Sequence, residues 1–510
     1  MTPATDLLAE LHSYRPLRLT ADPLRLDDGG PIVVPGVRPE ALGDASFRRD
    51  HGLRFAYLAG SMANGIGSVE IVEAMARAGM LGFFGAAGLS IGRIASAVDR
   101  LQSSVGELPH GFNLIHSPGE PRHETEVVEL YLARGVRLVE ASAYLDLTLP
   151  VVRFRTAGIH LGANGQVIAP NRIIAKVSRV EVATRFFSPP TEKMLAELVQ
   201  AGHLSDEQAR LARRVPVAQD ITAEADSGGH TDNRPAITLI PTLIALRDRL
   251  QAEHRYDVPL RVGAAGGIAT PASCAAAFLM GAAYVMTGSI NQACRESGSS
   301  DLVREMLAQA EQADVIMAPA ADMFEMGVKL QVLKRGTMFA MRAARLYELY
   351  RAYPSLDAIP AADRATIEKT IFRAPLADIW AETEAFWRDR DPAQVGRALK
   401  EPRHKMALVF RWYLGLSSRW ANAGDPGRKV DYQVWCGPSM GAFNEWTRGT
   451  FLEDWRDRRV VTVAGSLLHG AAVLTRVHFL RCQGVEVPAE WARVAPVDSQ
   501  TEKVVLRQSC

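Results

Sequence analysis

Short, uninterrupted apolar runs alternate with longer amphipathic segments from about residue 54 to residue 290. The amphipathic segments carry apolar residues at helical spacing, as Val69, Val72, Met75 and Ala76 do. The apolar runs predict strands buried on both faces, and they lie at residues 54–60, 81–86, 111–115, 136–142, 172–178, 217–225, 260–268 and 283–289. Buried strands that alternate with helices predict a parallel sheet covered by helices.

Strand–helix units repeated in this way fit an α/β fold of the (β/α)8 TIM-barrel type, whose chemistry lies in the loops at the C-terminal strand ends. A doubly wound open sheet is the alternative. Such a sheet would carry a GxGxxG fingerprint at its first strand–helix turn, but "AGSMANGIGS" (59–68) lacks that spacing. We therefore predict the barrel.

The hydrophobic pattern outside the eight predicted strands indicates further elements and domain boundaries. Asn164-Gly165 predicts a hairpin that leads into the fifth barrel strand. Beyond residue 295 the strand patterns stop, and residues 300–420 read as successive amphipathic helices, which predicts an additional mainly helical subdomain. We expect an N-terminal extension, the barrel, a helical subdomain, and a C-terminal helical segment that packs on the barrel, at residues 1–50, 51–295, 296–440 and 441–510 respectively.

Charge and cysteine usage narrow the function classes. The chain has 58 Lys+Arg and 57 Asp+Glu, so no global field favours nucleic acid or an anionic membrane. The cysteines show no CxxC spacing, which argues against a disulfide framework or a thiolate zinc site; they are Cys274, Cys294, Cys436, Cys482 and Cys510. A reducing, cytoplasmic location is expected, since the first residues also lack the apolar core of a secretory signal.

One uncharged stretch, residues 262–294, is long enough to cross a membrane. It contains Gly266-Gly267 and Pro271, which are typical of turns between separate elements. We expect this stretch to be buried core rather than a membrane span.

Glycine-rich turns follow the last two predicted strands, "GAAGGI" (263–268) and "TGS" (287–289). In a barrel these turns expose backbone N–H groups that can bind a phosphate, and glycine permits its close approach. The candidates are Gly266, Gly267, Gly288 and Ser289. Tight turns alone would explain either motif, but two at adjacent strand ends favour a phosphate-bearing cofactor.

Polar and small residues at other strand ends add candidates. The stretch "AGSMANGIGS" (59–68) is rich in Gly, Ala and Ser, and small residues there would let a flat ring lie against the backbone, near Gly60, Ser61, Met62 and Ala63. A simple turn that leads to a Ser68 helix cap is the alternative, and it is compatible with that role.

Asn113 and Lys176 are polar residues within apolar strands. A buried lysine is costly unless it pairs with an anion or lies beside an electron-rich ligand, so Lys176 is a stronger candidate than Asn113, which a satisfied core amide would also explain.

The loop after the sixth predicted strand, "EADSGGHTDNRPA" (224–236), holds a candidate acid–base residue. Gly228 and Gly229 would let the backbone bend so that His230 points into the barrel mouth, where an imidazole can donate a proton or bind a carbonyl. A metal site at His230 with Asp226 and Asp232 lacks the usual ligand spacing. Asp232 and Arg234 could equally stabilise the loop as a pair.

These motifs together resemble the PfaD-type flavin-dependent enoyl reductases, which act in trans on polyunsaturated fatty acid and polyketide synthases. The resemblance covers most of the chain, and it rests on "AGSMANGIGS", "GFNLIHSP", "KVSRVEVATRFFSPP", "EADSGGHTDNRP", "GAAGGIATP", "TGSINQ" and "KLQVLKRGTMFAMRAARLYELY". The barrel part is also similar to nitronate monooxygenase and to the flavin-type enoyl-acyl carrier protein reductase.

The resemblance implies FMN across the top of the barrel, with its phosphate at the two glycine turns and its ring near residues 60–63. It also implies that Asn113, Lys176, Gly228 and Gly229 contact the flavin and that His230, together with Lys176, serves catalysis. NADPH or NADH would supply hydride for reducing the α,β-double bond of an enoyl thioester.

The thioester would be bound to the acyl carrier protein of a polyketide or polyunsaturated fatty acid synthase, and the resemblance leaves room for a homodimer. Basic residues of the helical subdomain would contact the acidic carrier protein or the phosphates of its phosphopantetheine arm. The alternative is that these side chains only face solvent. They are Lys329, Lys334, Arg335 and Arg342. A nitronate-oxidising flavoenzyme and a non-catalytic barrel scaffold of a megasynthase are the alternative functions.

Overall fold

A closed barrel of eight parallel strands forms the centre of the protein, whose computed structural model describes residues 4–21 and 24–497. The barrel order is β4-β5-β6-β7-β10-β11-β13-β14, and β14 pairs with β4 to close it. The strands are β4 (Tyr57–Ala59), β5 (Leu81–Phe84), β6 (Gly111–Ile115), β7 (Leu138–Ser142), β10 (Arg172–Val177), β11 (Asp220–Glu224), β13 (Arg261–Ala265) and β14 (Val285–Thr287). Each predicted apolar run contains one of these strands, so the predicted fold class is confirmed.

Helices surround the barrel, and several begin at the polar caps that their sequences supply. The Ser68 hydroxyl accepts a hydrogen bond from the Ile71 N–H, and Thr270 forms a capping box with Ser273. The helices of this layer are α3 (Val69–Arg77), α4 (Ile91–Val105), α5 (Pro121–Ala133), α6 (Leu149–Thr156), α7 (Val180–Phe187), α8 (Glu192–Gln200), α9 (Asp206–Ala212), α10 (Ala236–His254), α11 (Pro271–Leu279) and the single turn α12 (Ser289–Gln292). The hairpin predicted at Asn164-Gly165 is also present, as β8 (His160–Leu161) paired with β9 (Val167–Ile168).

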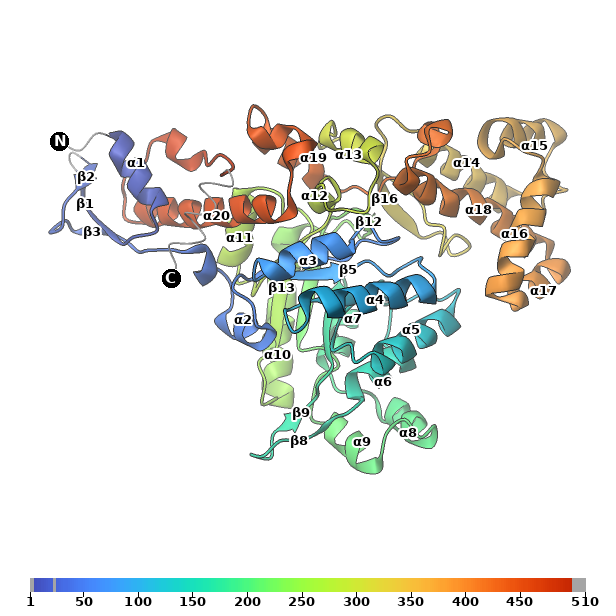
Figure 1. Ribbon diagram of the computed structural model, residues 1–510, viewed down its shortest axis with the longest axis horizontal. Helices are drawn as coiled ribbons and strands as arrows, with labels where there is room; N and C mark the ends of the chain where they lie inside the picture. The colour runs from blue at the N-terminus through green and yellow to red at the C-terminus, as the bar shows by residue number, and fades with distance from the viewer. Residues whose placement is uncertain (1–3, 22–23, 498–510) are drawn as a thin grey trace.

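A helical subdomain with its own hydrophobic core follows the barrel and lies at one end of the long axis (Figure 1). Its aromatic side chains Phe339, Phe372, Phe410 and Tyr413 are buried in that core. The helices after the barrel are α13 (Asp301–Ala308), α14 (Phe339–Ala352), α15 (Ala361–Ile367), α16 (Leu376–Arg390), α17 (Pro392–Lys400), α18 (Pro402–Ala423), α19 (Ser439–Thr447) and α20 (Val460–Cys482); a π-helical turn (Glu368–Phe372) and 3-10 turns (Pro426–Asp431, Phe451–Glu453, Trp455–Asp457, Ala489–Ala492) connect or follow them.

The prediction that residues 300–420 contain no strands is wrong. β15 (Val315–Pro319) pairs antiparallel with β16 (Lys329–Leu333), and β16 pairs on its other edge with β12 (Gly229–His230). β12 belongs to the loop after β11, so this small sheet joins the barrel to the subdomain. β12 and β16 pair across about 100 residues of sequence, and a local sequence pattern carries little information about such a pairing.

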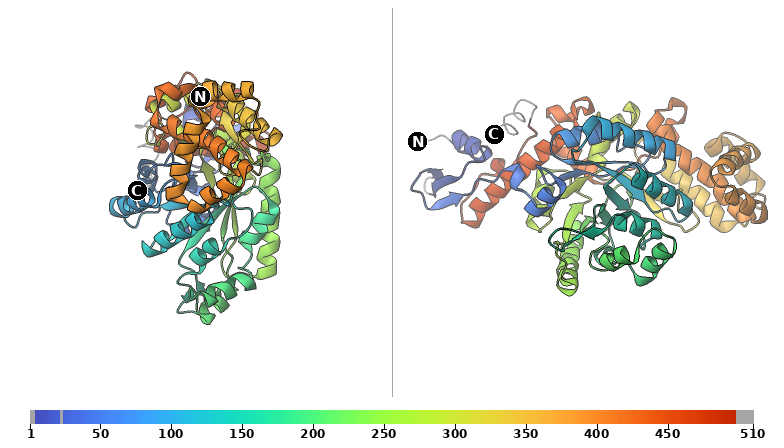
Figure 2. Two further views of the ribbon diagram at one scale, coloured as in Figure 1. Left: turned by 90° about the vertical axis from the view of Figure 1, so that its right-hand side faces the viewer. Right: turned by 60° about the horizontal axis from the view of Figure 1, so that its bottom comes forward.

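The N-terminal part lies at the opposite end from the helical subdomain (Figures 1 and 2). A three-stranded sheet packs with α20 around Leu19, Val34, Val477 and Leu480. The elements before the barrel are α1 (Ala4–His12), β1 (Leu17–Ala21), β2 (Leu24–Leu26), β3 (Ile32–Val34), a 3-10 turn (Pro39–Ala41) and α2 (Ala45–His51).

Helix α20 packs on α11 and α3 of the barrel, as expected for the C-terminal segment. Among the described residues it is the one helix long and apolar enough to cross a membrane, and 83% of its most apolar window is buried inside the structure. The uncharged stretch 262–294 divides into β13, α11, β14 and α12 and so forms no single long helix. Cys510 lies outside the described residues.

A buried ionic network closes the base of the barrel, at the N-terminal strand ends. The Asp220 carboxylate, which begins β11, accepts hydrogen bonds from Arg261 Nε at 2.6 Å and pairs with His51 Nε2 at 2.9 Å. Burial opposes ionisation of Asp220, but His51 and Arg261 outweigh it and lower the pKa of this carboxyl. Because the network lies opposite the loops that carry barrel chemistry, we assign it to stability.

Replacing Asp220 with asparagine should therefore destabilise the fold strongly. The substitution leaves Arg261 buried without its main counter-ion, and removing one partner of a buried pair costs about 3–5 kcal/mol. The free energy of unfolding, measured by denaturant titration of D220N, tests this. Asp257→Asn, which removes an exposed carboxylate 3.8 Å from Arg214, serves as the control and should change stability by less than about 1 kcal/mol. Equal stabilities of the two variants would contradict the assignment.

Candidate active site

One cavity of about 590 Å³ opens at the C-terminal ends of the barrel strands, and every site residue predicted from the sequence lines it. We call it the inner cavity. The predicted residues that line it are Gly60, Ser61, Met62, Ala63, Asn113, Lys176, Gly228, Gly229, His230, Gly266, Gly267, Gly288 and Ser289. Its size is in the range of cofactor and substrate sites. The subdomain lines its far side with residues that the sequence did not single out: Phe386, Trp387, Leu408, Arg411 and Trp412.

Lys176 lies between two carboxylates of neighbouring strands. Its Nζ is 3.4 Å from Glu140 Oε1 on β7 and 3.1 Å from Glu224 Oε1 on β11. Burial alone would lower the pKa of Lys176, but the two carboxylates outweigh it and raise that pKa above its ordinary value, so the ammonium stays charged. Lys176 therefore has the anionic partners that a buried lysine requires, and it also lines the cavity.

Glu140 connects Lys176 to the turn after β4. Its carboxylate is fully buried and accepts hydrogen bonds from the Ser61 N–H at 3.0 Å and the Ser61 hydroxyl at 2.7 Å. Burial raises its pKa, against the opposing effect of Lys176 and Ser61. Sequence reasoning missed Glu140, although a carboxylate inside "VRLVEAS" gives the same signal that identified Lys176. Next to it, the Asn113 side chain donates to the Glu140 carbonyl and the Ser142 hydroxyl at 3.2 and 2.9 Å.

The glycine turns form an open cradle at the ends of β13 and β14. Gly266 and Gly267 both have positive φ, +78° and +75°, which favours glycine. A Cβ at Gly266 would lie 2.6 Å from the Ala225 backbone, whereas a Cβ at Gly267 or Gly288 would meet nothing within 4 Å. The last two glycines therefore leave room that a side chain would fill. Ser289 Oγ accepts a hydrogen bond from the Gly437 N–H at 3.1 Å, so its own proton remains able to bind an anion.

The loop 224–236 holds His230 against the subdomain. Gly229 provides the bend, with φ +81°, while a Cβ at Gly228 would lie 2.9 Å from the backbone of Cys436. His230 Nε2 lies 3.1 Å from Asp322 Oδ1, and the imidazole is half-buried. Burial opposes protonation, but Asp322 outweighs it and raises the pKa of His230. No local sequence signal could have found Asp322, which lies 92 residues further along the chain.

The other charged residues of this loop support its shape. Asp226 accepts hydrogen bonds from the side-chain amides of Gln331 and Asn233, both at 2.8 Å. Asp232 pairs with Arg179 through both carboxylate oxygens, at 2.8 and 2.9 Å, so the suggested Asp232–Arg234 pair is replaced by a bond to the loop after β10. Within residues 4–21 and 24–497, no group of three or more His, Cys, Asp and Glu side chains could hold a metal ion.

The basic residues that the sequence offered for an acidic partner do not line the inner cavity. Arg342 pairs with the buried Asp431 of the subdomain, and Arg335 pairs with Asp314 and Glu311. The positive charge of these residues in the sequence did not indicate that carboxylates of the same chain would pair with them. The arginines that do reach the cavity from the subdomain are Arg390, Arg411 and Arg419.

Comparison with known proteins places this geometry in a family. Residues 51–348, more than half of the chain, match the nitronate monooxygenase family, and residues 353–432 match the inserted helical domain of [acyl-carrier-protein] S-malonyltransferase. The enoyl reductase domain of MlnA from the macrolactin biosynthesis cluster of Bacillus amyloliquefaciens has a similar structure, with a TM-score of 0.82 and 40% sequence identity over 87% of this chain and 99% of that domain.

Two curated relatives are longer than this chain. One polyunsaturated fatty acid synthase component of Thraustochytrium sp. is 47% identical over 492 residues, which cover 94% of this chain and 33% of that protein. Polyketide biosynthesis protein PksE of Bacillus subtilis is 44% identical over 443 residues, which cover 87% of this chain and 57% of that protein. The chain thus spans between a third and somewhat over half of these relatives. Together with the matched motifs, these similarities show that the chain belongs to the PfaD type within the nitronate monooxygenase family of flavin-dependent oxidoreductases.

Proposed function

We propose that the protein is an enoyl reductase that uses FMN and NADPH or NADH to reduce the α,β-double bond of carrier-protein-bound enoyl thioesters in polyketide or polyunsaturated fatty acid biosynthesis. The observation that carries this proposal is the inner cavity, in which an open glycine cradle, a charged Lys176 and the His230–Asp322 pair line one space beneath aromatic side chains of the subdomain. The MlnA enoyl reductase domain supports it, because its similarity extends over both parts of the chain that form the cavity.

The residues present fit FMN. The open space at Gly267 and Gly288, together with the Ser289 hydroxyl, would hold its phosphate, and the turn at residues 60–63 would lie along its ring. Asn113 and Lys176 line the same space, where the Lys176 cation would favour a negatively charged ring. When bound, FMN supplies the hydride that is transferred to the β-carbon, after reduction by the nicotinamide cofactor.

His230 is the chain's candidate proton donor. With its pKa raised by Asp322, the imidazolium can donate a hydrogen bond to the thioester carbonyl or a proton to the α-carbon. Asp322 orients the ring through Nε2 and stabilises the charged form. The aromatic side chains of Trp387 and Trp412 would exclude water from the reacting thioester.

The proposed function is tested by an absorbance spectrum of the purified protein, followed by anaerobic titration with NADPH and then with a crotonyl thioester. We expect a flavin spectrum that NADPH bleaches and the thioester restores, because the two substrates exchange a hydride through one cofactor. Oxygen-dependent turnover of a nitronate without a nicotinamide would instead support an oxidase, the second candidate that the family match favours. A colourless protein that takes up no FMN would indicate a non-catalytic scaffold.

Removal of the His230 imidazole should impair the chemical step. Since general acid catalysis contributes about 10²–10⁴-fold, His230→Ala should lower kcat by that order while FMN remains bound.

Asp322→Asn should keep the His230 imidazole but lower its pKa. The active imidazolium exists below this pKa, so the alkaline limb of kcat/KM against pH should move to lower pH in D322N, with activity recovered on acidification. An unshifted limb would remove His230 from the proton-donating role.

The glycine cradle makes a separate prediction about cofactor binding. Gly288 has a negative φ of −133°, and a Cβ there would meet no protein atom within 4 Å but would enter the proposed phosphate site. Gly288→Ala should weaken FMN binding by about tenfold or more, since overpacking costs about 1–3 kcal/mol. Flavin fluorescence titration measures the Kd. Gly396→Ala in α17 also fills open space and serves as the control with unchanged Kd. Equal Kd values for both variants would place the phosphate elsewhere.

A further inference from the structure

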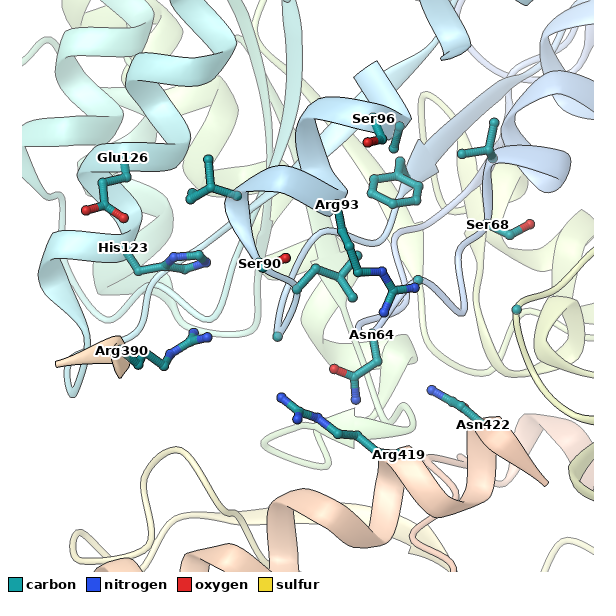
Figure 3. Close-up of a pocket in the computed structure, with 18 of the residues that line it drawn as sticks. Asn64, Ser68, Ser90, Arg93, Ser96, His123, Glu126, Arg390, Arg419 and Asn422 are labelled. Carbon is teal, nitrogen blue, oxygen red and sulfur yellow. The ribbon is translucent and has the colours of Figure 1, made fainter. Parts of the chain in front are cut away.

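A second cavity of about 1130 Å³ lies between the barrel helices α4 and α5 and the subdomain helices α16 and α18 (Figure 3). We call it the outer cavity. It shares lining residues with the inner cavity, among them Asn64, His123, Arg390 and Arg419, so the two spaces adjoin. A ligand whose reactive end lies in the inner cavity can therefore extend into the outer one.

Three arginines from three separate helices line the outer cavity, and two of them, Arg390 and Arg419, also line the inner cavity. Arg93 comes from α4, Arg390 from the end of α16 and Arg419 from α18, and Figure 3 shows their side chains directed into the space between barrel and subdomain. Arg390 Nη2 and Nε lie 2.5 and 2.8 Å from Glu120 Oε2. Within residues 4–21 and 24–497, Arg93 and Arg419 form no ion pair with a carboxylate.

The outer cavity also has acidic residues, but most of them are engaged elsewhere. Glu70 pairs with Arg100, Glu126 pairs with Arg122, and Asp391 caps the first turn of α17. Asp389 is the remaining carboxylate of the lining, and it is exposed. The positive charge of Arg93 and Arg419 is thus not neutralised locally by these groups.

The directions of two pKa shifts agree with an excess of positive charge at this point. Burial lowers the pKa of Arg419, and the nearby Arg390 and Arg93 lower it further. The pKa of His123 is likewise lowered, first by burial and then by Arg390, while Glu120 and Glu126 act in the opposite direction. Arg93 also lies in the first turn of α4, where a cation opposes the helix dipole. Arg419, which lies near two other cations, would therefore be stabilised by a bound anion.

We propose that Arg93, Arg390 and Arg419 bind a phosphate group of a ligand that extends from the outer into the inner cavity. Guanidinium groups suit this role, because their planar donors match phosphate oxygens. The inference rests on the proposed function, which requires two ligands that carry phosphate: the phosphopantetheine arm of a carrier protein and the nicotinamide dinucleotide.

Calorimetric binding to the FMN-loaded protein tests the proposal without turnover. The probes are 4′-phosphopantetheine against pantetheine, which lacks the phosphate, and NADP⁺ against NAD⁺. The test variant is R93Q/R419Q. The matched control is R388Q/R397Q, which removes two exposed arginines of α16 and α17 that pair with Glu384 and Glu401 and line neither cavity.

We expect the wild-type protein and the control to bind 4′-phosphopantetheine at least about tenfold more tightly than pantetheine, and R93Q/R419Q to lose this preference, as charge-assisted hydrogen bonds are lost. If R93Q/R419Q instead lowers the affinity for NADP⁺ by that factor and leaves the preference for 4′-phosphopantetheine over pantetheine intact, the bound phosphate belongs to the dinucleotide. Unchanged affinities for every probe in R93Q/R419Q would overturn the proposal.

Folding and function can be separated in this experiment. The Tm of R93Q/R419Q should equal or exceed that of the wild type, since the substitutions remove like charges from each other's vicinity. A phosphate preference in a protein that reduces no enoyl thioester would reject the proposed function but keep the phosphate site. If the protein reduces the thioester but R93Q/R419Q changes the affinity for none of the probes, the proposed function stands and the phosphate site is rejected.

Discussion

The pairing of two barrel-loop residues with a strand of the next domain holds the site together. Gly229 and His230 form β12 on the edge of β16, and this register brings His230 to Asp322 at the end of the neighbouring β15. The same contact fixes the height of the subdomain above the barrel mouth. The depth of the inner cavity and the protonation of His230 thus depend on a ladder only two residues long on the barrel side, reinforced by the Gln331 amide on Asp226.

The barrel was predictable because its strands are buried on both faces. Such strands appear as short, uninterrupted apolar runs, and each run is visible in the sequence without knowledge of its partner. β15 and β16 were not predicted because β16 pairs on one edge with β12, about 100 residues earlier in the chain. The same distinction applies to the site. Glycine turns and a lysine in an apolar strand are local signals, whereas the Asp322 partner of His230 and the Asp431 partner of Arg342 become evident only once the chain has folded.

Charge is used differently at the two ends of the barrel. At the base, Arg261, Asp220 and His51 satisfy one another and leave no group available to a ligand. At the mouth, Lys176 has a carboxylate on each side yet still lines the cavity, and Arg93 and Arg419 face solvent-filled space without a carboxylate partner among the described residues. The paired charges at the base stabilise the fold, and this stability offsets the cost of the unpaired charges at the mouth. Binding sites commonly reduce stability in this way.

The two ends of the helical subdomain return to one strand of the small sheet. Val332, just before the subdomain helices, bridges to Trp435, just after them, and the Leu333 N–H donates to the Val434 carbonyl at 2.9 Å. The segment in between is therefore an insertion with neighbouring entry and exit points, and it contains the separately matched helical domain at 353–432. Chains with adjacent ends can be inserted or exchanged without redirecting the host fold. Recombination of this module would therefore change the walls of the inner cavity, while the barrel and its glycine cradle stay the same.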